Sequence, residues 1–209
     1  LFPNLGERAD DLCLIRSMQC DQPAHPSAMT QMHTGTARFI RPSLGAWTLY
    51  GLGTENDSVP GFISLNPVSG NSRNYGSAFL PSIYGGTKVG GGGPGNKQTV
   101  RDLSNQKLSR QQQRAQLDLM QMLNRKKLAR DKFQPQIEGV IETYELAFRM
   151  QDAMPAVMDT SKETAATLSM YGVDKEETTS FGRQCLLARR MVESGVRFVE
   201  VTQGRWDQH

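Results

Sequence analysis

The sequence predicts an α/β fold in which a mostly parallel sheet is flanked by helices. Short apolar runs recur at 12–18, 60–65 and 196–202, and stretches with helical spacing lie between them. In the last run, apolar residues occupy both odd and even positions, so both faces of the strand are apolar. This pattern is typical of a parallel strand that is buried on both faces. Strands that alternate with helices along a chain favour a layered α/β arrangement. No internal repeat interrupts this alternation.

The first expected elements are a strand, a polar loop and a helix. The run 12–18 is short, apolar and preceded by Asp10 and Asp11, which favours a buried strand. After a polar loop, Pro26 suits the first turn of a helix, because its missing N–H costs nothing there. Gly35 is placed to end this helix as a glycine just beyond the last turn.

A second helix and a second strand are expected before a long irregular stretch. The helix lies at about 45–50, ahead of Gly51, and the strand at 60–65. Residues 66–97 are rich in Gly, Ser, Asn and Pro and lack periodicity, so they are expected to form a loop excursion within the domain. The segment Gly95-Asn96-Lys97 does not supply the spacing of a phosphate-binding P-loop.

The second half of the chain has mainly helical spacing. After Pro135, apolar residues fall at i, i+3, i+4, i+7 and i+11, which gives one apolar stripe. Thr160-Ser161-Lys162-Glu163 is a capping box that opens a short helix, and Gly172 closes it. The helices expected in this half therefore lie at about 105–131, from 135 onward, between 160 and 172, and at 181–193.

Charge, hydropathy and cysteine content argue against several classes of protein. The 24 basic and 21 acidic residues nearly balance, and the basic cluster from Arg125 to Lys132 spreads around a helix without interleaved aromatic residues. We therefore expect a solvated face and no nucleic-acid partner. No stretch approaches the roughly 18 apolar residues of a membrane span. No signal peptide is visible within the chain, and the cysteines lack the spacing of a zinc or redox site.

Two polar clusters follow predicted strands, where ligands bind in open α/β sheets. In the first, His25 directly precedes the helix at Pro26, so it lies beside free backbone N–H groups and the positive end of a helix dipole. That position suits a sulfate or phosphate oxyanion. A histidine that only caps the turn is the alternative.

The second polar cluster is Trp206-Asp207-Gln208-His209. Asp207 and His209 are two positions apart, so an extended segment points both to one side, and carboxylate with imidazole is a usual pair for zinc, manganese or iron. An exposed polar tail is the alternative. A third group, Arg41-Pro42-Ser43 with Thr54-Glu55-Asn56 across a short helix, either lines a pocket or caps helix ends. Arg41 is its candidate anion contact.

The chain contains several longer motifs: Arg41–Trp47, Tyr50–Asn56, Glu145–Gln151, Cys185–Arg190, Gly195–Phe198 and Trp206–His209. These motifs resemble a bacterial family called domain of unknown function 1501. The resemblance runs over nearly the whole chain and implies a branch of the alkaline phosphatase and sulfatase superfamily. That superfamily has a three-layer fold with a mostly parallel sheet, and it hydrolyses sulfate or phosphate esters at a metal site on the carboxyl edge of the sheet.

The resemblance implies roles for three residues. Sulfatases carry a C-x-P-x-R motif followed by a helix that ends in Thr-Gly, and counting back from Thr34-Gly35 places the nucleophile position at His25 and the arginine position at Met29. The sequence departs from the motif at both positions, which leaves His25 as a ligand, a nucleophile or a relic. Asp207 and His209 resemble the start of the later ligand group for a divalent metal ion of the zinc, manganese or calcium class.

The same resemblance implies that residues 1–209 form a single incomplete sulfatase-like domain, truncated at both ends. Further ligands would then lie outside the chain, and the fragment is expected to be inactive. The complete protein is expected to be exported, or periplasmic, by the twin-arginine route. Its expected activity is metal-dependent hydrolysis of a small-molecule or glycan sulfate or phosphate ester. The alternative is a non-catalytic sulfatase-like protein that acts in binding or at a surface.

Overall fold

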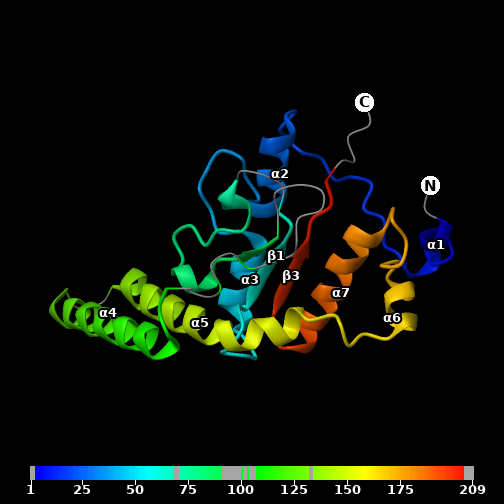
Figure 1. Cartoon of the computed structure of the whole chain (residues 1–209). Coiled ribbons are helices and arrows are strands. Elements are labelled where there is room, and N and C mark those ends of the chain that lie inside the picture. Colours follow the sequence, from blue (N-terminus) through cyan, green and yellow to red (C-terminus); the bar gives the residue numbers. More distant parts are fainter. Residues whose placement is uncertain are drawn as a thin grey trace.

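The computed structural model describes residues 3–67, 71–90, 100, 103, 107–131 and 134–204. In these residues a three-stranded parallel sheet is enclosed by helices, so the predicted α/β class and the parallel sheet are confirmed (Figure 1). The strands are β1 (Phe62–Leu65), β2 (Thr87–Val89) and β3 (Phe198–Val201). The described helices are α1 (Pro3–Gly6), α2 (His25–Thr34), α3 (Leu44–Leu52), α4 (Arg110–Asp131), α5 (Pro135–Met158), α6 (Ala165–Met170) and α7 (Thr179–Glu193), with short 3₁₀ turns η1 (Ala9–Asp11), η2 (Ser72–Asn74) and η3 (Ser82–Tyr84).

The sheet has the order β2-β1-β3, so β1 is central. All four residues of β1 are buried, as expected for a parallel strand covered on both faces. The residues of β3 are only half-buried, although the sequence predicted full burial. The reason is its position, because β3 lies at the edge of the described sheet.

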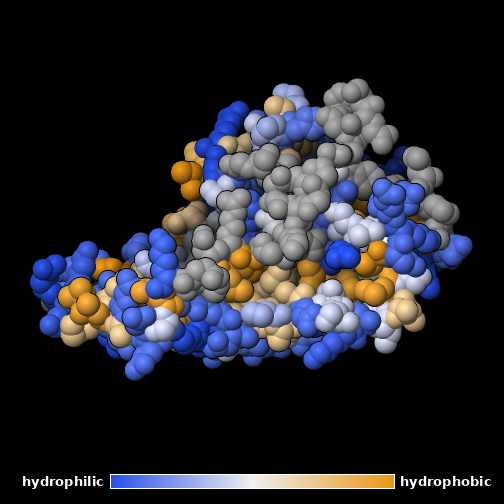
Figure 2. All heavy atoms as spheres, in the orientation of Figure 1, coloured by the Kyte–Doolittle hydropathy of each residue, from blue (hydrophilic) through white to orange (hydrophobic). Residues whose placement is uncertain are grey.

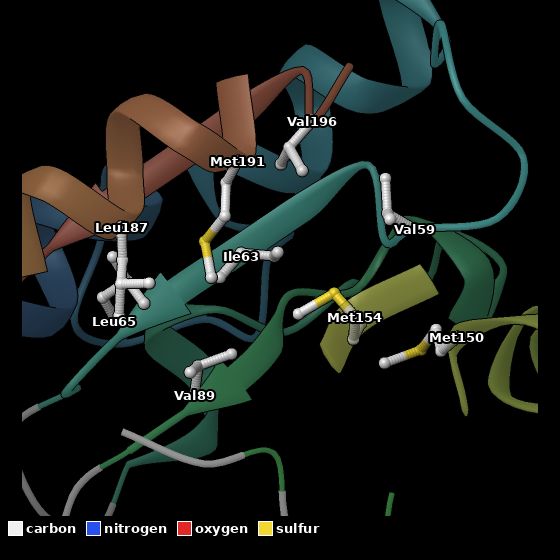
Figure 3. Close-up of a cluster of buried hydrophobic side chains, with 9 residues drawn as sticks. All are labelled: Val59, Ile63, Leu65, Val89, Met150, Met154, Leu187, Met191 and Val196. Carbon is white, nitrogen blue, oxygen red and sulfur yellow. The ribbon is translucent and has the colours of Figure 1, made fainter. Parts of the chain in front are cut away.

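One face of the sheet packs against α5 and α7 to form the hydrophobic core (Figure 3). Ile63 and Leu65 of β1 point to this face, as their alternate positions require. Met154 of α5 and Met191 of α7 meet them and are fully buried. The flexible methionine side chains fill the space between strand and helices.

The opposite face of the sheet carries α3. Phe62 of β1 packs edge to face against Phe198 of β3, with ring centroids 5.2 Å apart. Helix α3 approaches so closely that a Cβ atom on Gly45 would lie 2.5 Å from Cζ of Phe62. The helix begins after Ser43, whose hydroxyl accepts a hydrogen bond from the backbone N–H of Ala46 at 3.4 Å. Only glycine permits this spacing between helix and strand.

Helices α4 and α5 form an antiparallel pair that extends to one side of the sheet (Figure 1). Arg114 of α4 donates two hydrogen bonds, of 2.8 and 2.9 Å, to the carboxylate of Glu145 on α5. This guanidinium holds the pKa of Glu145 below its usual value. Figure 2 shows hydrophobic residues among hydrophilic ones on this extension, where Leu119, Met122 and Leu123 of α4 are exposed.

Two sequence predictions about irregular segments are wrong. The run 12–18 is not a strand, and its side chains are exposed, with Leu14 81% and Ile15 63% accessible. An apolar run becomes a strand only when another strand pairs with it, and the described sheet offers no partner to this run. The stretch 66–97 was predicted as loop alone, yet it contains β2, whose three residues are too few to show a period.

The predicted helix ends agree with the structure in α2 and differ in α6. Gly35, at φ 74°, ends α2 as expected. Helix α6 begins after Thr164, whose hydroxyl accepts from the N–H of Thr167, so the capping box expected at Thr160 is wrong. Glu163 instead accepts hydrogen bonds from Arg189 and Arg190 of α7. No described helix is long and apolar enough to cross a membrane.

Candidate functional site

A row of polar side chains crosses the sheet near the carboxyl ends of its strands. Ser64 of β1 is in register with Lys88 of β2 and with Glu200 of β3. Residues in register point to the same face, and neighbouring strands are about 4.8 Å apart, so the three side chains lie side by side. Ser64 is fully buried, and its hydroxyl has no hydrogen-bond partner in the described part of the chain.

Helix α2 adds a histidine to this row. It lies at the end of the sheet where β3 stops (Figure 1). The Nδ1 atom of His33 is 3.5 Å from Oε1 of Glu200, and the two side chains are only 22% and 17% exposed. Thr202 donates a hydrogen bond of 3.3 Å to the same carboxylate oxygen. Burial raises the pKa of Glu200, while His33 and the hydroxyl oppose that rise. This separation is longer than the roughly 2.6–3.2 Å over which general acids and bases exchange protons, so the two groups are close neighbours of residue types that acid–base chemistry uses.

A buried hydrogen-bond cluster holds α2 in place. Thr30, one turn before His33, is 2% exposed. Its hydroxyl accepts a 2.7 Å hydrogen bond from the Asn71 amide and lies 3.1 Å from Oδ1 of Asn74. These contacts join α2 to the turn η2. They fix the helix against the polar row and so position His33.

An asparagine at the carboxyl edge of the sheet forms hydrogen bonds to the ends of the neighbouring strands. Asn66, the first residue after β1, has the unusual φ of +50°. Its backbone N–H donates to the carbonyl of Val89 at 2.8 Å, and its side-chain amide donates to the carbonyl of Thr202 at 3.5 Å. A non-glycine residue in this conformation marks a backbone that the surrounding structure holds in place. Asn66 thereby links the ends of all three strands.

The structure separates His25 from this edge. His25 is the first residue of α2 and is exposed, as the predicted position at a helix N-terminus requires. His33 lies eight residues further along the same helix, which corresponds to about 12 Å. The histidine that contacts Glu200 is therefore His33, and a catalytic role of His25 remains a prediction.

The predicted metal ligands Asp207 and His209 lie outside the described residues. Within the described ranges, no group of three or more His, Cys, Asp or Glu side chains is arranged to hold a metal ion. A protein metal site usually takes at least three such ligands. The described residues therefore do not make a metal site by themselves.

Arg41 and the segment Thr54–Asn56 do not form one pocket. The nine residues of α3 separate them by about 14 Å along the helix. Arg41 is exposed, with its guanidinium carbon 5.8 Å from the centre of the Phe39 ring. An anion contact by Arg41 thus remains a prediction without a second described group to support it.

A separate cavity of about 460 Å³ lies at the amino edge of the sheet. Thr54 and Asn56 line it, together with Gly61 directly before β1. At its rim, Arg149 donates a hydrogen bond of 2.7 Å to the backbone carbonyl of Asp57. Arg149 and Asp57 also line the cavity, and the remaining lining residues are Leu49, Gly53, Val59, Ile83, Tyr84, Ile141, Glu142, Glu145 and Leu146.

The sequence contained one unused signal for the polar row. Glu200 stands between Val199 and Val201 in an apolar strand, and a charged residue in such a position is rarely buried without a partner. Its partner His33 is more distant in the chain, and nothing local connects the two residues. Ser64 and Lys88 gave no signal, because only the strand register aligns them with Glu200.

These features define an α/β protein whose parallel sheet carries a half-buried carboxyl–imidazole pair near its carboxyl edge. The family model described as "Protein of unknown function (DUF1501)" matches residues 1–209. The chain therefore belongs to this family, as its motifs indicated. Comparison with curated proteins and with solved structures gave no match.

Proposed function

We propose that this chain is part of a metal-dependent hydrolase of sulfate or phosphate esters. The observation that carries the proposal is the contact of His33 with Glu200 near the carboxyl edge of a parallel sheet. Ligands of open α/β sheets bind at that edge. The family resemblance supports an exported protein and a small-molecule or glycan ester as substrate.

The polar row supplies two functions that such a reaction needs. In the proposed reaction Glu200, beside His33, donates a proton to the leaving oxygen or accepts one from an attacking water. Lys88, two strands away from Glu200, brings an ammonium group to the same face of the sheet. A fixed cation beside an anionic ester stabilises the charge that develops on its oxygens.

The metal part of the proposal rests on Asp207 and His209. A divalent ion of the zinc, manganese or calcium class, bound by these two residues and by others, would polarise the ester as a Lewis acid. Both residues follow β3 in the chain, and β3 ends at the carboxyl edge. Further ligands are expected beyond residues 1–209.

A non-catalytic binding protein is the second candidate. It is favoured by the departure from the sulfatase motif, which places His25 and Met29 where a sulfatase has its cysteine and arginine. Such a protein would keep the edge as a binding site for the anionic group and would turn over no ester.

The test uses the complete protein that contains residues 1–209. Metal content and hydrolysis of 4-nitrophenyl sulfate and 4-nitrophenyl phosphate are measured for the wild type and for Glu200→Gln, Asp207→Ala and His25→Ala. We expect hydrolysis by the wild type, at least a hundredfold lower rate for Glu200→Gln as for the loss of a general acid or base, and loss of metal for Asp207→Ala. Glu177→Gln, at an exposed position of the same charge, is the control. A metal-free wild type without activity would contradict the proposal and favour the binding protein.

A further inference from the structure

Four aromatic side chains form a connected row on the surface over α3 and the segment beside it. Trp47 lies 5.8 Å from Phe79 and 6.0 Å from Tyr50, and Tyr50 lies 5.2 Å from Tyr84, measured between ring centroids. Each pair is arranged edge to face. Phe79, Trp47 and Tyr50 are 61%, 44% and 53% exposed. A contiguous set of exposed aromatic rings is a feature typical of ligand-binding surfaces.

The row leads into the cavity at the amino edge. Tyr84 is both the last ring of the row and a lining residue of the cavity. Leu49 of α3 and Ile83 of η3 form the adjoining walls. Turn η3 is in contact with helix α3 and also with helix α5. The rings and the cavity thus form one continuous surface.

The rim of the cavity carries hydrogen-bonding groups of both kinds. Asp57 and Glu142 are exposed carboxylates, and Arg149 brings a guanidinium whose Nε is already used by the Asp57 carbonyl. Glu145 also faces the cavity, but Arg114 neutralises its charge. Carboxylates accept hydrogen bonds, and the remaining guanidinium nitrogens donate them. Among the described lining residues, the free charges of Asp57, Glu142 and Arg149 sum to one negative charge.

We propose that this surface binds an uncharged saccharide chain, with one sugar unit in the cavity and its neighbours along the aromatic row. A pyranose ring has an apolar face of C–H groups that packs on the negative face of an aromatic ring. Its hydroxyl groups both donate and accept, which matches the carboxylates and the guanidinium at the rim. The volume of about 460 Å³ lies in the usual range of about 300–1,000 Å³ for small-ligand sites. The excess negative charge at the rim disfavours sulfated or phosphorylated units.

This site is separate from the one proposed for ester hydrolysis. Gly61 and Val59, which line the cavity, precede β1, whereas the polar row lies near the opposite ends of the strands. Saccharide binding here neither requires nor supplies catalysis at the carboxyl edge. The two proposals can therefore fail independently.

The experiment follows the fluorescence of Trp47. The chain has two tryptophans, so a Trp206→Phe variant of the full chain leaves Trp47 as its only indole. This protein is titrated with cellohexaose, maltohexaose, xylohexaose and mannohexaose, and with a chondroitin sulfate hexasaccharide as the charged comparison. We expect a blue shift of the emission with at least one neutral hexasaccharide and at least tenfold weaker binding of the sulfated one.

Three variants test whether the binding uses this surface, with calorimetry as the readout because it needs no tryptophan. Trp47→Ala and Glu142→Gln are each expected to weaken binding at least tenfold. Phe181→Ala, at an exposed aromatic residue of α7 outside the row, is expected to leave it unchanged. Circular dichroism confirms that each variant is folded. The proposal is overturned if no neutral hexasaccharide binds, if the sulfated one binds best, or if Trp47→Ala binds as the wild type does.

Discussion

Glu200 of β3 and His33 of α2 meet across the junction of sheet and helix, with Oε1 and Nδ1 3.5 Å apart. Both side chains are mostly buried. A carboxyl group that loses water becomes harder to ionise, and a neighbouring imidazolium makes ionisation easier. For Glu200 the burial is the larger effect, so its pKa is raised.

The raised pKa makes stability depend on pH in a defined direction. The folded-state pKa of Glu200 lies above the unfolded value of about 4.3, so folding favours the protonated carboxyl. That contribution is present below about pH 4.3 and is lost as the pH rises through the folded-state pKa. Since glutamine stays neutral, the stability difference between wild type and Glu200→Gln should shift in favour of the variant as the pH rises. Urea unfolding from about pH 4 to pH 8 measures this, with Glu177→Gln at an exposed position as the control, and a wild-type advantage that grows with pH would contradict it.

Replacing Gly45 and Gly51 by alanine should distinguish the effect of close packing on the unfolding free energy from the effect of helix propensity. In Gly45→Ala the new Cβ meets the buried Phe62 ring at 2.5 Å, which should cost about 1–3 kcal/mol of unfolding free energy. Gly51 lies in the same helix with no atom within 4 Å of its Cβ position, so Gly51→Ala should stabilise by about 0.5–1 kcal/mol. Chemical denaturation of both variants checks the pair. Equal effects would show that α3 does not approach the sheet as described.

Truncation of Met154 should leave a hole between α5 and the sheet. The side chain is fully buried against Ile63 and its neighbours, and a methionine-to-alanine change at such a site costs about 2–5 kcal/mol. Met170→Ala, at an exposed position of α6, should change the stability by less than about 0.5 kcal/mol. Thermal unfolding monitored by circular dichroism distinguishes the two. A small effect of Met154→Ala would mean that α5 packs elsewhere.

Removal of the Thr30 hydroxyl should loosen α2. Thr30→Val keeps the shape of the side chain but leaves the amides of Asn71 and Asn74 short of a buried partner, at a cost of about 1–3 kcal/mol. Thr48→Val in α3 loses only a hydrogen bond to the carbonyl of Leu44 and is the matched control. Hydrogen exchange should speed up in α2 for Thr30→Val alone. Unchanged protection of α2 would indicate that other contacts hold it.

Local signals in the sequence predicted much of the fold and little of the site. Gly35 and Pro135 set helix ends through their own backbone preferences, so both were readable. The strand predicted at 12–18 is wrong because the burial of an apolar run depends on which other elements pack against it. A local sequence pattern holds no information about those elements. His33 and Glu200 meet only after α2 docks on the sheet, so their contact is a product of the fold.

The parallel pairing of β1 with β3 also bears on how the protein folds. Asn66 and Thr202, which bond across the end of this ladder, are 136 positions apart. The conformational entropy of this large loop is lost before the hydrogen bonds between the two strands can form. Chains with such distant contacts therefore fold slowly. During synthesis, β1 leaves the ribosome long before its neighbour β3 exists. The nascent chain therefore carries an unpaired edge of β1 until β3 has been synthesised, and such an edge is open to pairing with other chains.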